Sequence, residues 1–148
     1  MFNLRQRAGI MMVSCPDGNP YHVTATLQQP VGDGRVRCLA CPRKCIIPPG
    51  MYGLCKTKLN VDGTLCEVNY GKVSSVAMDP IEKKPFFHFM PGTYAYSIGT
   101  VGCNLFCEHC QNWVISQSDP ETFTYLRDLQ PEEAVREALD LGASSIAF

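Results

Sequence analysis

The stretch TYAYSIGTVGCNLFCEHCQN, residues 93–112, decides the fold class because it joins a predicted strand to a cysteine-bearing loop. Residues 93–100 form an apolar run that is typical of a buried strand. The loop that follows carries Cys103, Cys107 and Cys110 with the spacing C-x3-C-x2-C. In α/β sheets and barrels, ligands and catalytic groups collect at the carboxyl ends of the strands. The three thiols therefore stand where a functional site is expected.

A helix and a second strand are predicted downstream of this loop. Residues 131–141 begin with Pro131 at the first helical position, and Gly142 provides a C-terminal cap. Residues 143–148 then begin another apolar strand. The order strand, helix, strand predicts a βαβ unit with parallel strands and a right-handed crossover, and hence an α/β fold. The expected apolar stripe of the helix consists of Ala134, Val135, Ala138, Leu139 and Leu141.

Three closely spaced thiolates can bind three irons of a cubane cluster, whereas a structural 4Fe-4S centre normally uses four cysteines. The fourth iron would be left without a local cysteine, and an open metal position is what lets a site bind a substrate. Gly99 and Gly102 give the backbone room to approach a bulky cluster. The alternatives are a zinc site completed by His109 or by a distant cysteine, and three unligated thiols in the core.

With this loop, the sequence resembles the radical S-adenosylmethionine (SAM) enzymes, whose signature is C-x3-C-x2-C after the first barrel strand. His109 occupies the position before the last cysteine, where an aromatic residue is commoner in that family. The resemblance covers roughly Arg35 to Phe148. Within it, the radical SAM enzymes of the AmmeMemoRadiSam system, relatives of pyruvate formate-lyase activating enzyme, are suggested by VRCLACPRKCIIPPGMYGLC (36–55), YGKVSSVAMDPIEKKPFFHFMPG (70–92) and YSIGTVGCNLFCEHCQNWVISQ (96–117).

The resemblance implies a 4Fe-4S cluster on Cys103, Cys107 and Cys110, with SAM on the fourth iron and His109 near the cofactor. Reductive cleavage of SAM would release a 5'-deoxyadenosyl radical that abstracts hydrogen from a substrate, which could be a protein. A reductant such as ferredoxin or flavodoxin, and a Memo-type neighbour, are the implied partners. The implied fold is the N-terminal part of a partial (β/α)6 barrel, and the 148-residue chain is too short for the whole barrel. We therefore expect a fragment of a longer enzyme, truncated in the second strand.

A second cysteine cluster precedes the predicted barrel and forms a small Cys-rich extension. Its four members have the spacing C-x2-C-x3-C-x9-C, which suits structural zinc or a second iron-sulfur cluster; transient disulfides or free thiols are the remaining possibilities. The ligands would be Cys38, Cys41, Cys45 and Cys55. The family resemblance extends to these cysteines without deciding the metal. Cations surround them and would compensate thiolate charge or form a patch for RNA or an acidic protein: Arg35, Arg37, Arg43, Lys44, Lys56 and Lys58.

The chain divides into a partly irregular lead-in over residues 1–34, a cysteine-rich β unit over 35–92 and the start of the barrel over 93–148. In the lead-in, one short strand is expected near 21–27. Asp62-Gly63 stands between two short alternating runs, which predicts a β-hairpin. Another strand is expected over 71–78, followed by the polar turn DPIEKKP.

The remaining candidate residues receive structural interpretations. Cys15 and Cys66 match neither cluster and are expected to be ordinary thiols. His22 has no ligand-spaced neighbour, and His88 within PFFHFM is expected to pack in the core. The aromatic residues around His88, together with Trp113, are likewise expected to be core rather than a stacking platform for bases.

Composition and charge restrict the functional classes. Thirteen basic and 14 acidic residues give a net charge of -1, so no global positive field exists to attract nucleic acid or an anionic membrane. No apolar run is long enough to span a membrane, and the run 8–14 after Arg5 and Arg7 is short for a signal peptide. Clustered cysteines without a clear signal peptide favour a cytoplasmic location. The competing functions are a zinc-knuckle module that contacts RNA or protein and an iron-sulfur electron carrier without SAM chemistry.

Overall fold

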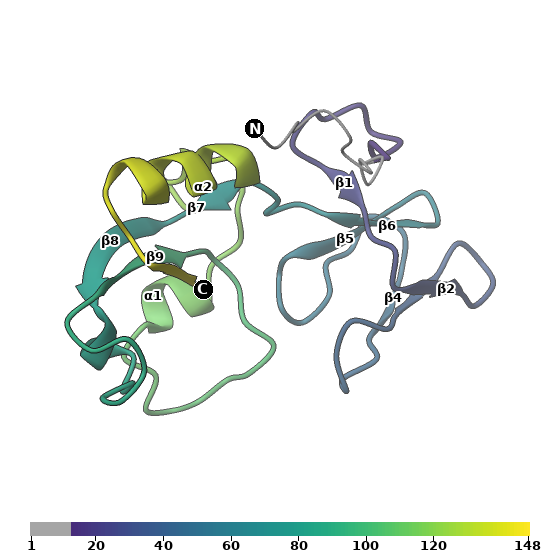
Figure 1. Ribbon diagram of the computed structural model, residues 1–148. Helices are drawn as coiled ribbons and strands as arrows, with labels where there is room; N and C mark the ends of the chain where they lie inside the picture. The colour runs from purple at the N-terminus through teal and green to yellow at the C-terminus, as the bar shows by residue number, and fades with distance from the viewer. Residues whose placement is uncertain (1–12) are drawn as a thin grey trace.

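The computed structural model describes residues 13–148. Arg5, Arg7 and most of the apolar run 8–14, which were considered as a signal peptide, lie outside the described residues. Figure 1 shows two halves, with β1 to β6 on one side and β8, β9 and both helices on the other. The strands of the first half are β1 (Val23–Thr24), β2 (Gln28–Pro30), β3 (Val36–Cys38), β4 (Ile46–Ile47), β5 (Lys58–Val61) and β6 (Thr64–Glu67).

Two small antiparallel sheets build the first half, with strand orders β1-β6-β5 and β2-β3-β4. The hairpin predicted at Asp62-Gly63 is confirmed, since Val61 pairs with Thr64 and both turn residues have positive φ. The strand expected near 21–27 is present only as the two-residue β1, with β2 following separately. Because β1 pairs with β6 and β2 with β3, the lead-in is part of the cysteine-rich unit and does not stand apart from it.

A disulfide between Cys15 and Cys66 joins the lead-in to β6, so the expectation of ordinary thiols was wrong. The two residues are 51 positions apart, and both are buried. Their pairing depends on the alignment of β1 with β6, which neither cysteine's local sequence reveals. Nearby, His22 is buried and its Nδ1 lies 2.6 Å from Oδ2 of Asp17.

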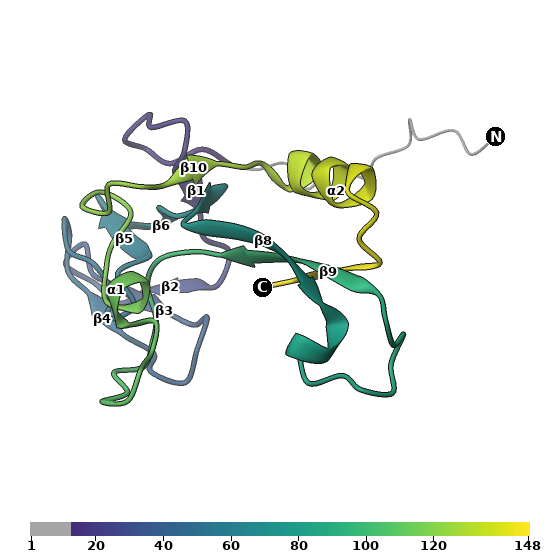
Figure 2. The same cartoon turned by 90° about the vertical axis from the view of Figure 1, so that its left-hand side faces the viewer.

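The second half is organised around one sheet with the order β11-β9-β8. The strand β9 pairs with β8 in antiparallel and with β11 in parallel orientation, and α2 crosses one face of this sheet (Figure 2). The predicted βαβ unit is therefore confirmed as β9–α2–β11. Its β8 neighbour comes from the segment before residue 93, so strand pairing crosses that expected boundary. The bounds are β7 (Lys72–Val73), β8 (Ser75–Pro80), η1 (Ile81–Lys83), β9 (Tyr94–Gly99), α1 (Trp113–Ser116), β10 (Arg127–Asp128), α2 (Pro131–Asp140) and β11 (Ser145–Ala147).

Helix α2 begins and ends as the sequence predicts. Pro131 is its first residue, the Gln130 backbone N–H donates to Glu133 Oε2 at 3.1 Å, and Gly142 follows the last turn at φ 72°. The predicted apolar stripe is only partly correct. Ala134 and Ala138 are buried against the sheet, whereas Val135, Leu139 and Leu141 are at least half exposed. In this ten-residue helix, the buried side chains are the two that lie four positions apart, at 134 and 138.

Short elements between β9 and α2 escaped prediction. The single-turn α1 follows the cysteine loop, and β10 pairs with β7 through Arg127 opposite Val73 and Asp128 opposite Lys72. This pairing joins segments more than fifty residues apart, so local patterns carry no signal for it. Over residues 13–148, α2 with its ten residues is the longest helix, and no helix could cross a bilayer.

The aromatic residues expected in the core are exposed. His88 and its neighbours Phe86, Phe87 and Phe89 lie on the connection from η1 to β9, at the opposite end of β9 from the cysteine loop. Trp113 is 65% exposed at the start of α1. These residues contribute to neither apolar core, because the connection and α1 lie outside the space between the sheets and α2. The core interpretation of His88 and Trp113 was therefore wrong.

Two separate cores stabilise the two halves. The first core draws on β3, β4, β6 and the segment between β1 and β2, and its members are Ala25, Val36, Cys38, Ile47 and Leu65. The second lies between α2 and the β11-β9-β8 sheet and contains Val73, Tyr96, Leu129, Ala134 and Ala138. Cys38 is a core residue of the first half, whereas no cysteine of the loop after β9 belongs to either core.

Candidate metal and cofactor site

The C-x3-C-x2-C loop leaves the carboxyl end of β9, as predicted. Cys103 and Cys110 are partly buried and Cys107 is exposed. The Leu105 backbone N–H lies 3.4 Å from Cys103 Sγ, and the Cys110 Sγ lies 3.4 Å from Ser116 Oγ on α1. A turn between the last two cysteines is closed by the Cys110 N–H and the Cys107 carbonyl at 3.2 Å. All three thiols are thus free, and solvent reaches the loop.

His109 is exposed on the same loop, and no hydrogen bond of its side chain is present in the described structure. The two glycines near the loop pack closely against other segments of the protein. A Cβ at Gly99 would collide with Ser75 Oγ on β8, and one at Gly102 would collide with the Cys55 carbonyl oxygen and with Thr57. Their missing side chains therefore allow close packing of protein against protein.

The four cysteines of the first cluster line one small cavity. The strands β3 and β4 place Cys38 and bring Cys45 close to it, since the Cys38 backbone N–H donates to the Cys45 carbonyl at 2.9 Å. Cys55 Sγ lies 3.3 Å from Thr57 Oγ1 just before β5. The cavity is lined by Cys38, Cys41, Arg43, Cys45, Ile47, Gly53, Leu54, Cys55, Lys58 and Asn104. We call residues 38–55 the knuckle.

The environments of the knuckle thiols differ. Burial raises the pKa of Cys38, whereas a hydrogen bond from the Arg43 backbone N–H, followed by one from the Asn104 side chain, lowers the pKa of Cys41. Of the expected compensating cations, Arg43 and Lys58 line the cavity, and Lys58 also forms an ion pair with Glu67.

Three of the other four cations have partners elsewhere. Arg35 pairs with Asp33, Arg37 donates to Gln29 Oε1, and Lys56 donates to the Gln117 carbonyl. Of the six cations expected near the four thiols, Arg43 and Lys58 line their cavity.

Among residues 13–148, no three His, Cys, Asp or Glu side chains form a group that could hold one metal ion. The chemistry of the donors nevertheless suits the expected metals. Four thiols on one cavity are the donor type of structural zinc and of iron-sulfur centres, and the three thiols after β9 are the donor type of a cluster. Iron-sulfur ligation spreads the thiolates over several irons, so it does not require them to meet at one point.

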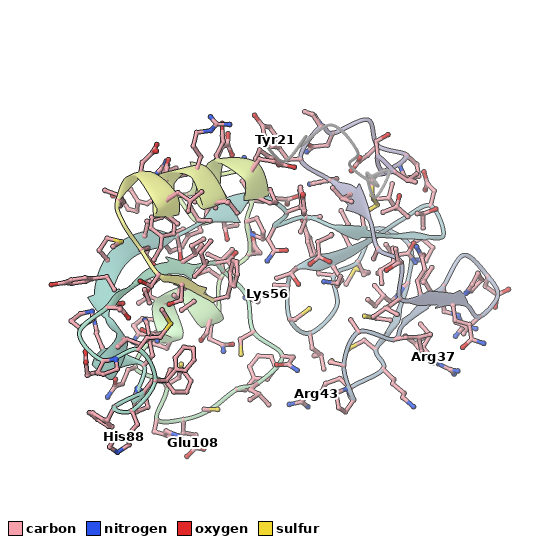
Figure 3. All side chains as sticks on the ribbon, viewed as in Figure 1. Tyr21, Arg37, Arg43, Lys56, His88 and Glu108 are labelled. Atoms are coloured by element: carbon pink, nitrogen blue, oxygen red, sulfur yellow. A yellow bond between two sulfur atoms is a disulfide. The ribbon has the colours of Figure 1, made fainter. Side chains whose placement is uncertain are left out.

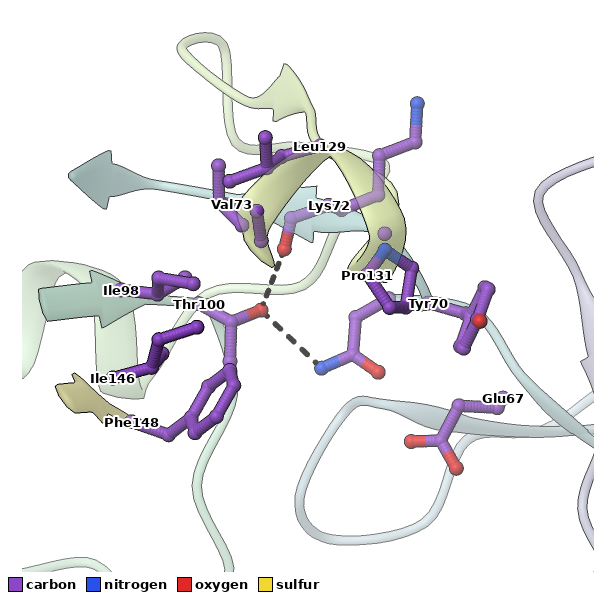
Figure 4. A pocket seen from close by; sticks show the side chains of 13 residues that line it. Glu67, Tyr70, Lys72, Val73, Ile98, Thr100, Leu129, Pro131, Ile146 and Phe148 are labelled. Carbon is purple, nitrogen blue, oxygen red and sulfur yellow. Dashed lines mark hydrogen bonds between the residues drawn. The ribbon is translucent and has the colours of Figure 1, made fainter. Parts of the chain in front are cut away.

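An apolar cavity of about 300 Å³, which the sequence did not predict, lies beside the carboxyl end of β9 (Figure 4). At its polar edge, Asn69 Nδ2 donates to Thr100 Oγ1 at 3.4 Å, and Thr100 Oγ1 donates to the Lys72 carbonyl at 2.9 Å. Its apolar wall includes Ile98, Leu129, Ala134, Ile146 and Phe148. No cysteine lines this cavity, so it is separate from both thiol sets. Its volume and its mostly apolar lining would suit a small apolar ligand group.

Comparison with known proteins finds a relative of this chain. The chain is 47% identical over 124 residues to an uncharacterized protein of Methanocaldococcus jannaschii. The match covers 84% of this chain and 37% of that protein, so the chain spans little more than a third of the length of the relative it matches. No protein family matches the sequence. No solved structure matches it either.

Proposed function

We propose that the chain is part of a radical SAM enzyme, in which Cys103, Cys107 and Cys110 hold a 4Fe-4S cluster. When bound, the cluster supplies the electron that cleaves SAM to a 5'-deoxyadenosyl radical. The observation that carries this proposal is the position of the three free thiols, on the loop that leaves the carboxyl end of β9 in a parallel βαβ unit. Three thiolates leave one iron open for SAM, and His109 is the candidate neighbour of the cofactor.

The complete enzyme is proposed to be activase-like and to form a partial barrel from further βα units. A protein substrate, a ferredoxin or flavodoxin reductant, a Memo-type neighbour and a cytoplasmic location belong to this proposal. These features concern the whole enzyme, and this chain spans only 37% of the length of its relative. The support within the chain is the sheet β11-β9-β8, whose parallel pair is the kind of unit from which such barrels are built.

The knuckle is proposed to hold zinc or a second iron-sulfur cluster through Cys38, Cys41, Cys45 and Cys55. Support comes from their common cavity and from Arg43 and Lys58 beside it, which would offset the negative charge of four thiolates. The expected role is structural, because Cys38 is also a member of the first core.

The proposal is tested by reconstituting the chain anaerobically with iron and sulfide, then recording metal content and EPR spectra with and without SAM. We expect a brown protein whose EPR signal shifts when SAM is added. Cys107→Ser should abolish this shift, and the matched variant Cys41→Ser, in the other thiol set, should retain it. A colourless protein with zinc at both sets would favour the zinc-module function, and a cluster signal that ignores SAM would favour an electron carrier; either result overturns the proposal.

A further inference from the structure

The two thiol sets, far apart in the sequence, are joined by side chains of the knuckle region. Arg43 Nε donates to the Asn104 carbonyl at 3.0 Å, immediately after the first cysteine of the loop. Lys56 Nζ donates to the Gln117 carbonyl at 2.5 Å, immediately after α1. Figure 3 shows both cations between the two halves of the molecule, whereas Arg37 points away at the outer side of the first half. The two contacts thus hold the segment 104–117 near both of its ends.

Backbone packing brings the same two regions together. Gly102 lies so close to the Cys55 carbonyl oxygen and to Thr57 that no Cβ would fit there. Asn104 lines the cavity of the four knuckle thiols. The first residues of the cysteine loop therefore contact the knuckle directly. The residue that follows α1 contacts Lys56, which comes directly after the knuckle.

Within the loop, further bonds transmit this anchoring. The Gly102 N–H donates to the Ile115 carbonyl at 2.9 Å, and Gln117 Nε2 donates to the Leu105 carbonyl at 3.2 Å. These bonds tie the entry of the loop to α1. A displacement of either anchored end would therefore be passed on to the segment that carries the three thiols.

The backbone of Lys56 gives an independent indication that its side chain matters. Its φ of 61° lies in the left-handed region, where a lysine is strained and glycine is at ease. Such strain persists where surrounding contacts over-determine the conformation. Here the charge-assisted bond to Gln117 requires the lysine side chain at a position that suits glycine better.

We infer that Arg43 and Lys56 are positioning residues that hold the C-x3-C-x2-C loop on the knuckle. This inference rests on the proposed function only in assigning the loop its task; the contacts themselves are independent of any cofactor. Loss of either cation would leave the fold of both halves intact and would raise the frequency with which residues 102–117 open. Cluster retention by the loop would then depend on residues outside it, in the knuckle region.

Hydrogen exchange measured by mass spectrometry on the purified chain, without cluster reconstitution, tests this directly. Lys56→Gly removes the bond and relieves the backbone, so we expect unchanged or higher stability towards urea together with about tenfold faster exchange over residues 102–117. Arg43→Gln should accelerate the same amides by about threefold, since its bond is exposed. The conservative variants Arg43→Lys and Lys56→Arg keep a cationic donor, so residues 102–117 should exchange as slowly in them as in the unmodified protein.

The matched control is Arg37→Gln, which removes a cation of the same region whose partner is Gln29. It should leave exchange over 102–117 unchanged, and none of the variants should alter the β5–β6 hairpin. Unchanged exchange over 102–117 in both Lys56→Gly and Arg43→Gln would overturn the inference, as would acceleration that the conservative variants fail to reverse. A missing SAM-dependent EPR signal would remove the proposed function and leave this result intact, so the two failures are distinguishable.

Discussion

The knuckle and the cysteine loop both present free thiols, but they are built differently. The knuckle has Cys38 inside an apolar core and all four thiols on one cavity. The loop after β9 has no cysteine in a core, and its middle thiol, Cys107, is exposed. Packing thus places the four cysteines of the first set around one cavity, whereas the second set depends on contacts with neighbouring segments.

This difference teaches where the order of a metal site can originate. Short strands such as β3 and β4 fix the backbone on both sides of Cys41, and Lys58 at the start of β5 also lines the cavity. The loop receives its order from the contacts of Gly102, Arg43 and Lys56 between the loop and the knuckle region. We call this set of contacts the seam. The comparison predicts that changes in the knuckle's supports lower global stability most, that a clash at Gly102 lowers it less, and that loss of Arg43 or Lys56 affects only the order of the loop.

The largest effect is expected for Asn60→Ala, which would break the knuckle's support. Asn60 is fully buried; its Nδ2 donates to the carbonyls of Gly34 and Ile47 at 2.8 and 2.7 Å, and its Oδ1 accepts from Gly63 N–H at 2.8 Å. Removing the amide leaves the buried Ile47 carbonyl without this partner and breaks two part-buried bonds, which together should cost about 3–5 kcal/mol of unfolding free energy. Urea denaturation measures this.

Asn69→Ala is the matched control for Asn60→Ala, because its amide makes only bonds of 3.4 Å near the surface. Its expected loss is below about 1 kcal/mol. Equal losses in the two variants would contradict the view that the knuckle is supported by buried polar contacts.

At the seam, Gly102→Ala should destabilise the protein by about 2–4 kcal/mol, because the methyl group meets the Cys55 carbonyl and φ is 87°. Gly92→Ala has a similar φ of 77° with nothing within 4 Å, so it should cost only about 1 kcal/mol. The difference between the two unfolding free energies isolates the clash. If they match, the close approach between loop and knuckle contributes nothing.

A smaller, pH-dependent effect is expected at the other end of the sheet. Asp79 accepts hydrogen bonds from Lys83, Lys84 and Ser97, which hold the pKa of its carboxyl well below the ordinary value of 3.8. A depressed pKa gives stability that is present above pH 3.8 and is lost as the pH falls below it. When the urea midpoint is plotted against pH, Asp79→Asn should therefore reduce the fall at acid pH. An unchanged fall would show that other carboxyls cause the loss of stability.

The smallest effect is expected on the outer face of α2. Leu139 is 70% exposed, so Leu139→Lys should change the unfolding free energy by less than about 0.5 kcal/mol. Ala138, one residue earlier, is buried against the sheet, and Ala138→Leu should cost about 1–3 kcal/mol through overpacking. Thermal denaturation of the pair distinguishes the two faces, and a reversed order would refute the observed orientation of the helix.

Local signals in the sequence predicted the elements that depend on local chemistry. Asp62-Gly63 predicted the hairpin through its turn geometry, and Pro131 with Gly142 predicted the ends of α2. Which face of that helix is buried depends on the sheet beneath it, so the prediction was right for Ala134 and Ala138 and wrong for Val135 and Leu139. The long-range β7–β10 pairing and the exposure of Trp113 likewise depend on tertiary packing that no short window contains.

For the candidate site, the sequence supplied the residues and the structure supplied their relations. The spacing of Cys103, Cys107 and Cys110 predicted a loop at the carboxyl end of a strand, and the structure has it there. The seating of that loop on Cys55, through Gly102, could not be inferred, because it joins segments that are 47 residues apart in numbering and share no motif. Cofactor identity stays a prediction for both thiol sets.

The Cys15–Cys66 bond has a topological consequence for the knuckle. It closes a covalent ring across 51 positions, and all four knuckle cysteines lie inside that ring. A single proteolytic cut within the ring would leave the two pieces joined until a reductant is added. Ring closure also shortens the reach of the denatured polypeptide, a restriction that stabilises the folded form by about 4 kcal/mol in the chain-entropy account. Even when unfolded, the four thiols would remain members of one macrocycle and would stay within a bounded distance of one another.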